Sequence, residues 1–313
     1  MPDKSRHCHR IDLRGKRFNV RMESRLFPKT GRATVRDALI IFSPCKNRRA
    51  KLTFISMTNP KRNILITGAG GGLGRGLGLC LAQQGHTILA TDLNLAGAAE
   101  TAALVEKAGG KAEAHALDVT SEEGVQRLVQ QIGDRRIDVL INNAGLQHVS
   151  RIEDFPTAKW DLLLNVMLKG TFLMTRAVLP VMRAHGFGRI IHIGSIHSLI
   201  ASPYKSAYVA TKHALIGFSK TVALETADAD ITSNTICPAY IQTPLVDAQI
   251  KDQARTRQIS EDEVIQRIML EPMPKKAFIS FEEIAAAVEY LATPLARNVT
   301  GQTITIDGGW TAR

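Results

Sequence analysis

The chain has 313 residues, 44% of them apolar and 22% charged, and its 40 Lys and Arg against 29 Asp and Glu give a net charge of +11, a balance that by itself favours a nucleic-acid-binding protein. The excess is confined to one end, because residues 1–56 contain 15 basic and 4 acidic side chains whereas residues 57–313 contain 25 of each. The neutral body is long enough to bury one sizeable core, and its composition excludes fibrous, disordered and disulfide-scaffold proteins.

Residues 1–56 mix basic and scattered apolar residues without a sustained period of 3.6 or 2.0. We therefore expect a poorly ordered extension. Met57 stands just before the first strand pattern, so the simplest hypothesis is that translation begins there and that residues 1–56 are an upstream extension. The alternative is an organelle transit sequence, which is also basic and poor in acidic residues.

From residue 57 onward, short β-branched runs alternate with amphipathic helical stretches, as is typical of a parallel sheet covered by helices. Helices are predicted at 157–185, which stops before Gly186, and at 206–225. Residues 239–276 are too long for an ordinary connection, which predicts a mobile substrate lid. The fold class expected for residues 57–313 is one Rossmann-type, doubly wound α/β domain with seven parallel strands, at 63–67, 87–91, 112–117, 139–142, 189–194, 232–237 and 303–307.

Cysteine spacing and hydropathy point away from a metal centre and from a membrane. The segment 7–9 (HCH) has no partner cluster elsewhere, so no metal site is predicted. No window approaches 18 consecutive apolar residues. We expect a cytoplasmic protein without a disulfide framework, because no C-x-x-C pair occurs among Cys8, Cys45, Cys80 and Cys237.

A glycine-rich turn, residues 67–74 (TGAGGGLG), joins the first strand to a helix. Glycines let the backbone approach a pyrophosphate, whose charge the helix N-terminus favours; alone, the string also fits a flexible loop. Asp92, 20 residues beyond Gly72 at the end of the second strand, strengthens the nucleotide interpretation. A carboxylate there would bind both ribose hydroxyls and repel a 2′-phosphate, which predicts NAD. The alternatives are that Asp92 is a helix-capping acid, or that Arg75 admits NADP.

Tyr208 and Lys212 lie four residues apart in the predicted helix 206–225, so their side chains emerge on one face. A phenol titrates near pH 10, and a neighbouring ammonium favours the phenolate, so we expect the lysine to lower the tyrosine pKa. A surface tyrosine beside a solvated lysine is the alternative. The context favours a proton-transfer unit: Ser195 follows the fifth strand, and polar residues stand at 142–145 (NNAG) after the fourth.

With Asn165 in the next helix, these motifs resemble the short-chain dehydrogenase/reductase family over residues 61–313. The resemblance implies that Tyr208 is the acid/base, that Ser195 polarises the substrate oxygen, and that Lys212 binds the nicotinamide ribose and lowers the tyrosine pKa. It implies that Asn165 positions a water in a proton relay. It also implies cofactor contacts from Tyr208 and Lys212 and from a set of loop residues: Gly68, Gly72, Leu73, Gly74, Asp92, Asp118, Val119, Asn143, Gly145, Pro238, Ile241 and Thr243.

Polar residues near this unit that the chemistry does not require indicate the substrate. Gln147, His197, Lys205 and Gln249 would offer several donors to a small carboxylate, although each alone also fits a loop or surface position. Within the family, the likeness narrows to bacterial-type D-3-hydroxybutyrate dehydrogenases, through segments 145–149, 152–156, 188–197, 207–213, 243–246 and 307–310. It implies that these four residues hold the substrate carboxylate.

Two departures from the family pattern occur after the sixth strand. Ala239 replaces the usual glycine of a Pro-Gly pair, which puts the backbone there in doubt because alanine tolerates positive φ less well. Tyr240 stands where a tryptophan is common, so the methyl end of the pocket is expected to differ in size or polarity.

The function expected from the resemblance is reversible, NAD-dependent oxidation of D-3-hydroxybutyrate to acetoacetate by a homotetramer with neither nucleic-acid nor membrane partners. One alternative is another family member acting on a different small hydroxy acid or on a 3-oxoacyl substrate. A 3-oxoacyl reductase would normally favour NADPH and carry a basic patch, which Asp92 and the neutral body disfavour. From a different class come an NAD(H)-sensing protein, disfavoured by the complete catalytic set, and a nucleic-acid-binding protein using residues 1–56.

Overall fold

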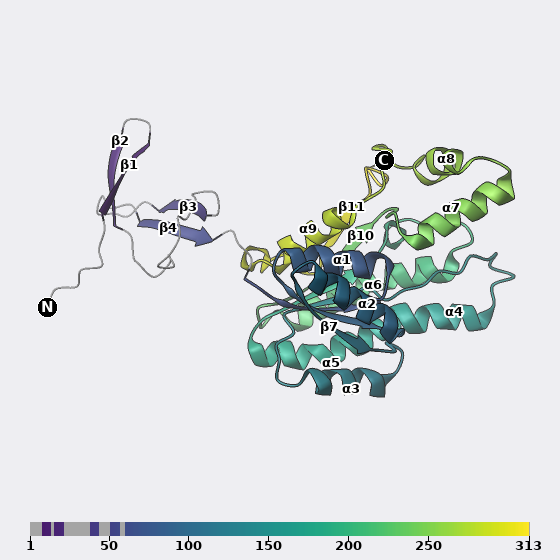
Figure 1. The fold of residues 1–313 in the computed structure, drawn as a ribbon, viewed down its shortest axis with the longest axis horizontal. Helices are drawn as coiled ribbons and strands as arrows, with labels where there is room; N and C mark the ends of the chain where they lie inside the picture. The colour runs from purple at the N-terminus through teal and green to yellow at the C-terminus, as the bar shows by residue number, and fades with distance from the viewer. Residues whose placement is uncertain (1–7, 14–15, 22–37, 44–50, 57–59, 313) are drawn as a thin grey trace. The chain divides into compact units, whose positions relative to one another are not determined.

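The computed structural model describes residues 8–13, 16–21, 38–43, 51–56 and 60–312, and the chain divides into two units, Met1–Pro60 and Lys61–Arg313 (Figure 1). In the first unit, β1 (Cys8–Leu13) pairs with β2 (Lys16–Arg21), and β3 (Ala38–Ser43) with β4 (Lys51–Ser56), both antiparallel. The sequence predicts no regular element there. Short runs such as ALIIF suit paired strands even though they are too brief to establish a period. The hypothesis that translation starts at Met57 concerns a residue outside the described part.

The second unit is built on one parallel sheet of seven strands, as predicted, ordered β11-β10-β9-β8-β5-β6-β7. The chain runs from β5 outward to β7, then returns to β8 and runs the other way. Two neighbouring strands, β5 and β8, thus lead into loops that diverge, and such a switch point is where open α/β sheets bind ligands. The strands are β5 (Asn63–Thr67), β6 (Thr87–Asp92), β7 (Lys111–Ala116), β8 (Val139–Asn142), β9 (Gly188–Ile193), β10 (Ile231–Pro238) and β11 (Thr303–Ile306).

Helices cover both faces of this sheet (Figure 1). One apolar core lies under α1 (Gly72–Gln83), α2 (Leu95–Lys107) and α9 (Phe281–Ala292). The other lies under α3 (Glu122–Ile132), α5 (Gly170–His185) and α6 (Ser206–Glu225). The central strands are buried along their whole length, which is why they read as continuous apolar runs in the sequence.

The predicted helix 157–185 is present but is not uniform. It consists of α4 (Thr157–Leu164), a π-helical turn η3 (Asn165–Lys169) and α5, and it ends at Gly186, which has a φ of 66°. By length and composition this is the one helix of the described residues that would suffice to cross a membrane. That is weak evidence, since core helices pass the same criterion, and Met174 and Val178 are fully buried against the sheet.

The predicted lid, residues 239–276, contains α7 (Pro244–Arg257), α8 (Glu261–Val264) and a π-helical turn η5 (Ile265–Met269). Four of its side chains form a small apolar cluster of their own: Val246, Ile250, Val264 and Met269. The lid is therefore a packed helical element, and its mobility remains a prediction.

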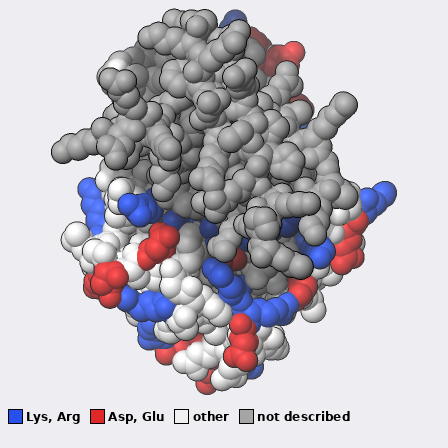
Figure 2. Space-filling model, turned by 90° about the vertical axis from the view of Figure 1, so that its left-hand side faces the viewer, with Lys and Arg blue, Asp and Glu red and all other residues white. Residues whose placement is uncertain are grey.

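Charged side chains of both signs are interspersed over the described surface that Figure 2 shows. This agrees with the equal numbers of basic and acidic residues in positions 57–313. No single-sign patch of described residues is visible on that face, so its charge gives no support for a nucleic-acid-binding surface.

Candidate active site

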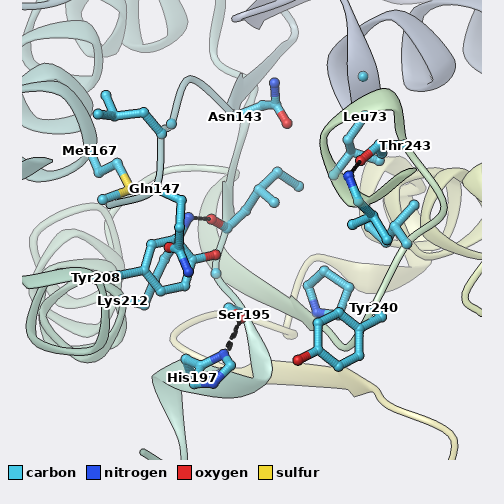
Figure 3. A pocket seen from close by; sticks show the side chains of 18 of the residues that line it. Leu73, Asn143, Gln147, Met167, Ser195, His197, Tyr208, Lys212, Tyr240 and Thr243 are labelled. Carbon is cyan, nitrogen blue, oxygen red and sulfur yellow. Dashed lines mark hydrogen bonds between the residues drawn. The ribbon is translucent and has the colours of Figure 1, made fainter. Parts of the chain in front are cut away.

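A cavity of about 460 Å³ lies at the carboxyl ends of the sheet strands (Figure 3). Its walls come from the glycine turn after β5, the ends of β6, β8, β9 and β10, the start of α6, and the start of the lid. The structure brings together in this cavity most of the site residues predicted from the sequence: Gly68, Gly72, Leu73, Asp92, Asn143, Gly145, Gln147, Ser195, His197, Lys205, Tyr208, Lys212, Pro238, Ile241 and Thr243.

The glycine turn has the shape that a pyrophosphate requires. Gly68 and Gly72 have φ values of 64° and 51°, and a Cβ on Gly74 would stand 2.2 Å from the Gly68 carbonyl oxygen. The Asn143 amide Nδ2 donates to the carbonyls of Thr67 (2.9 Å) and Gly68 (3.0 Å), which holds the turn against β8. No side chain caps the start of α1, and its first turn has no acidic residue, so backbone N–H groups are free to bind an anion.

Asp92 stands beside this turn at the end of β6. Its carboxylate accepts hydrogen bonds from the backbone N–H of Gly70 (2.8 Å) and of Asn94 (2.9 Å), and the residue also lines the cavity. The Arg75 guanidinium donates instead to Gly70 O and Glu100, both at 2.6 Å, outside the cavity. The glycine cradle, the free helix N-terminus and Asp92 together fit a nicotinamide dinucleotide.

Ser195, Tyr208 and Lys212 converge on the other side of the cavity (Figure 3). The buried Lys212 Nζ donates to the Ile193 carbonyl (2.6 Å) and lies 5.5 Å from the centre of the Tyr208 ring. Burial lowers the pKa of Lys212 to about 8. Burial raises the pKa of Tyr208, and the hydrogen bond with Ser195 opposes this rise.

The direction of the Tyr208 shift corrects the sequence-based expectation of a lowered pKa. Two effects compete, the loss of water around the phenolate and the attraction of a nearby cation. The Lys212 ammonium points at a backbone carbonyl, and the loss of water dominates. In this environment the phenol of Tyr208 is a neutral donor at neutral pH.

Ser195 begins a short 3-10 turn, Ile196–Ser198, directly after β9. Its Oγ accepts a hydrogen bond from the backbone N–H of His197 (3.2 Å) and lies 3.3 Å from His197 Nδ1. The other ring nitrogen, Nε2, lies 2.8 Å from Ser202 Oγ. Burial, with the charge of Lys205 adding to it, lowers the pKa of His197 to about 4, so the ring is neutral at neutral pH and donates through a single N–H.

Gln147 and Lys205 complete the polar wall. Gln147 Oε1 is buried without a hydrogen-bond partner, so the amide is available to a ligand. Lys205 has no acidic partner among the described residues, and burial lowers its pKa. It follows Tyr204, which has a φ of 67°, and the Tyr204 carbonyl accepts from Ser150 N (2.9 Å), joining the two loops that carry Gln147 and Lys205. A half-buried cation without a counter-ion favours an anionic ligand.

Asn165 is not part of this arrangement. Its side chain is exposed and does not line the cavity, whereas Met167, two residues further on, is buried and does. Both belong to η3, where the wider π turn changes which residues face inward. The Met167 side chain packs among Leu163 and Ala207, near Tyr208. The structure thus separates Asn165 from the other three predicted catalytic residues.

Three predicted cofactor residues also lie outside the cavity wall. Gly74 packs behind the glycine turn, as its close approach to Gly68 shows. Asp118 is exposed and accepts hydrogen bonds from the Thr120 backbone N–H and hydroxyl, while Val119 is buried. The side chain of Gln249, on α7, lies outside the described part of the chain.

The sequence assigned no site role to several residues that line the cavity, chiefly Leu146, Met167, Val246 and Trp310. Trp310 comes from a turn just after β11, where the Asp307 carboxylate accepts from Gly309 N (2.9 Å) and Thr311 N (2.7 Å). Its ring lies 5.7 Å from that of Tyr240. The terminal segment 307–310 (DGGW) carries part of the family resemblance, but its place at the site follows only from the fold.

The Ala239 substitution does not disturb the corner after β10. Positive φ values among the described non-glycine residues occur only at Tyr204, Gln258 and Lys276, so Ala239 has an ordinary φ. Its backbone N–H donates to Ile306 O (2.9 Å) on β11. No group of three His, Cys, Asp or Glu side chains that could hold a metal ion occurs among the described residues.

Comparison with known proteins gives the same family as the motifs. A family model described as enoyl-(acyl carrier protein) reductase, a group of short-chain dehydrogenases/reductases, matches residues 68–311. A D-beta-hydroxybutyrate dehydrogenase of Rhizobium meliloti is 44% identical over 259 residues, which is 80% of this chain and 99% of the relative. A protein of the same name from Cupriavidus necator is 37% identical over 254 residues, 80% of this chain and 98% of the relative.

More distant relatives carry other names. A 3-oxoacyl-[acyl-carrier-protein] reductase of Thermotoga maritima is 33% identical over 247 residues, 78% of this chain and 96% of that protein. The chain thus spans nearly the full length of relatives with different substrates, so the family follows from these comparisons and the substrate must be argued from the cavity.

Proposed function

The chain belongs to the short-chain dehydrogenase/reductase family of oxidoreductases, and from that premise we propose that it catalyses the reversible oxidation of D-3-hydroxybutyrate to acetoacetate with NAD. The observation that carries the proposal is the position of Lys205, Gln147 and His197 in the same cavity as Ser195 and Tyr208. A small hydroxy acid needs two binding sites a few bonds apart, one for its hydroxyl group and one for its carboxylate.

The proposed roles follow from the contacts. Ser195 Oγ, oriented by its bond to His197 N, holds the substrate oxygen beside the Tyr208 phenol. In reduction the neutral phenol of Tyr208 donates its proton to the substrate oxygen and becomes a phenolate. In oxidation the phenolate form of Tyr208 takes the hydroxyl proton as the carbonyl bond forms, and becomes the neutral phenol again. The nicotinamide ring, when bound, supplies the acceptor for the hydride that leaves the carbinol carbon. Lys212 fixes the Tyr208 side of the cavity through its bond to Ile193 O.

NAD is favoured over NADP by the polar groups at the end of β6. The Asp92 carboxylate would accept hydrogen bonds from ribose hydroxyls and repel a 2′-phosphate. Arg75, the residue that the sequence offered for such a phosphate, already donates to Gly70 O and to Glu100.

Turnover on a panel of short 3-hydroxy acids of both hands, each with NAD and with NADP, tests the proposal. We expect D-3-hydroxybutyrate with NAD to give the highest kcat/KM, with NADP at least tenfold poorer. An acetoacetyl thioester with NADPH belongs in the panel, because one relative is named a 3-oxoacyl-[acyl-carrier-protein] reductase. Equal rates with NAD and NADP would contradict the role of Asp92, and a preference for the thioester would contradict the substrate.

Replacing Lys205 with Met should raise KM for D-3-hydroxybutyrate about ten- to hundredfold, because a charge-assisted hydrogen bond to the carboxylate is lost. Steady-state kinetics should show KM for NAD within a factor of about two of the wild-type value. Lys107→Met, at the exposed end of α2, is the matched control and should change neither constant. If Lys205→Met left the hydroxy-acid KM unchanged, another secondary alcohol would be the better candidate substrate.

A further inference from the structure

Tyr240 is the one aromatic residue of the cavity whose hydroxyl the proposed reaction does not use. It lines the wall opposite Tyr208, and Figure 3 shows its ring projecting into the cavity with the hydroxyl directed to the side on which Ser195 and His197 lie. From the sequence, Tyr240 is a departure from the family pattern, in which a tryptophan is expected at this position.

Tyr240 is held through its backbone and through one face of its ring. Its backbone carbonyl accepts a hydrogen bond from Ile279 N (2.9 Å), and the adjacent Ile241 forms a parallel bridge with Ile279. The ring packs on Trp310, with centroids 5.7 Å apart and planes tilted by 36°. Because the backbone of Tyr240 and one face of its ring are held, the hydroxyl keeps one position. This lowers the entropic cost of a hydrogen bond to a ligand.

The hydroxyl is available to a ligand. It has no hydrogen-bond partner among the described residues. Burial raises the pKa of Tyr240, so the phenol is a neutral donor. A half-buried donor without a partner is unfavourable in a protein interior, and a ligand acceptor relieves that cost.

The charge next to Tyr240 indicates which ligand group it meets. Lys205 Nζ lies 5.9 Å from the centre of the Tyr240 ring, and this ammonium has no acidic partner among the described residues. An anion drawn to Lys205 therefore lies within reach of the phenol edge. Tyr240 and Tyr208 line the same cavity.

We propose that the Tyr240 hydroxyl donates a hydrogen bond to the substrate carboxylate held by Lys205, which makes Tyr240 a specificity-determining residue for short 3-hydroxy acids. The inference rests on the proposed function, since it takes the acid group from there. It places Tyr240 at the carboxylate end of the substrate, beside Lys205, rather than at the methyl end expected from the sequence.

The test is Tyr240→Phe, which keeps the ring against Trp310 and removes only the hydroxyl. KM for D-3-hydroxybutyrate should rise about ten- to hundredfold, since hydrogen bonds to charged groups are the strong class, with kcat within about threefold of wild type. The competitive inhibition constant of butyrate, which has the carboxylate and lacks the 3-hydroxyl, should rise by the same factor. The dissociation constant for NADH, measured by fluorescence, should not change.

Tyr290→Phe, which removes an exposed hydroxyl from α9, is the control and should change none of these constants. An unchanged inhibition constant of butyrate in Tyr240→Phe would overturn the inference. This holds even if the KM for D-3-hydroxybutyrate rises, because the phenol would then contact the carbinol end of the substrate rather than its carboxylate. If wild-type enzyme did not oxidise D-3-hydroxybutyrate, the proposed function would fail. Butyrate inhibition against the best substrate of the panel would still test Tyr240.

Discussion

A Tyr208→Phe variant is expected to retain at most a few per cent of the wild-type kcat for D-3-hydroxybutyrate oxidation. The substitution removes the phenol oxygen that interacts with Ser195 and leaves the aromatic ring in its apolar surroundings beside Met167. General acid–base catalysis by a positioned group contributes about 10²- to 10⁴-fold, and no other described side chain takes over that oxygen. Steady-state kcat at saturating substrate and NAD measures the loss.

The same variant separates chemistry from binding. The cofactor cradle lies on the β5 and β6 side of the cavity, and Lys212 keeps its bond to Ile193 O, so NADH should bind with a dissociation constant within about threefold of wild type. Tyr290→Phe, with an exposed hydroxyl removed, should show full activity. A Tyr208→Phe enzyme with a rate above a few per cent would remove Tyr208 from the reaction and leave the assignment of the acid/base open to Lys212 or His197.

The sequence predicted the centre of the sheet well because the central strands are buried on both faces. Ranges such as 63–67 and 139–142 agree residue for residue with β5 and β8, since a fully buried parallel strand must be a short, continuous apolar run with polar turns on either side. The spacing of Ser195, Tyr208 and Lys212 was equally informative. The two helical residues lie on one face of α6, and Ser195 follows a strand whose end reaches the same edge of the sheet.

Other features depend on geometry that spacing does not encode. The family resemblance implies a site role for Asn165, yet in the π turn η3 it is Met167 that lines the cavity, while the Asn165 side chain is exposed. A π turn leaves no mark in a 3.6-residue period, because a single wide turn shifts the inward face without interrupting the helix. The sign of the Tyr208 pKa shift likewise depends on burial, which one helix in isolation cannot reveal.

The aromatic wall of the cavity illustrates a second limit. Trp310 and Tyr240 are 70 positions apart, and their rings meet only because β10 and β11 pair side by side and release both residues at the same edge. Tyr240 was noted as a departure from a family pattern, but its neighbour Lys205 comes from yet another loop. These three residues come from three separate loops, which meet because of the order of the strands in the sheet. That order is a property of the fold and is not encoded in residue spacing.

Replacing Gly74 with Ala is expected to weaken cofactor binding strongly. The new Cβ would lie 2.2 Å from Gly68 O, 2.7 Å from Asn143 Nδ2 and 2.9 Å from Ala69 Cα. Two of these three atoms belong to the backbone, so no side-chain rotation removes the overlap, and Asn143 would have to give up its bonds to Thr67 O and Gly68 O. We expect the dissociation constant for NADH to rise at least tenfold.

Stability should fall with affinity in that variant, because overpacking against fixed backbone costs about 1–3 kcal/mol or more. Fluorescence titration of NADH and thermal unfolding measure the two effects. Gly217→Ala, at an exposed position of α6 where an added Cβ meets no atom within 4 Å, is the matched control and should raise stability by up to about 1 kcal/mol. If Gly74→Ala bound NADH as the wild type does, the turn between β5 and α1 would not be the pyrophosphate site. Asp92, which is hydrogen-bonded to that turn through Gly70 N, would then lose its role in selecting NAD.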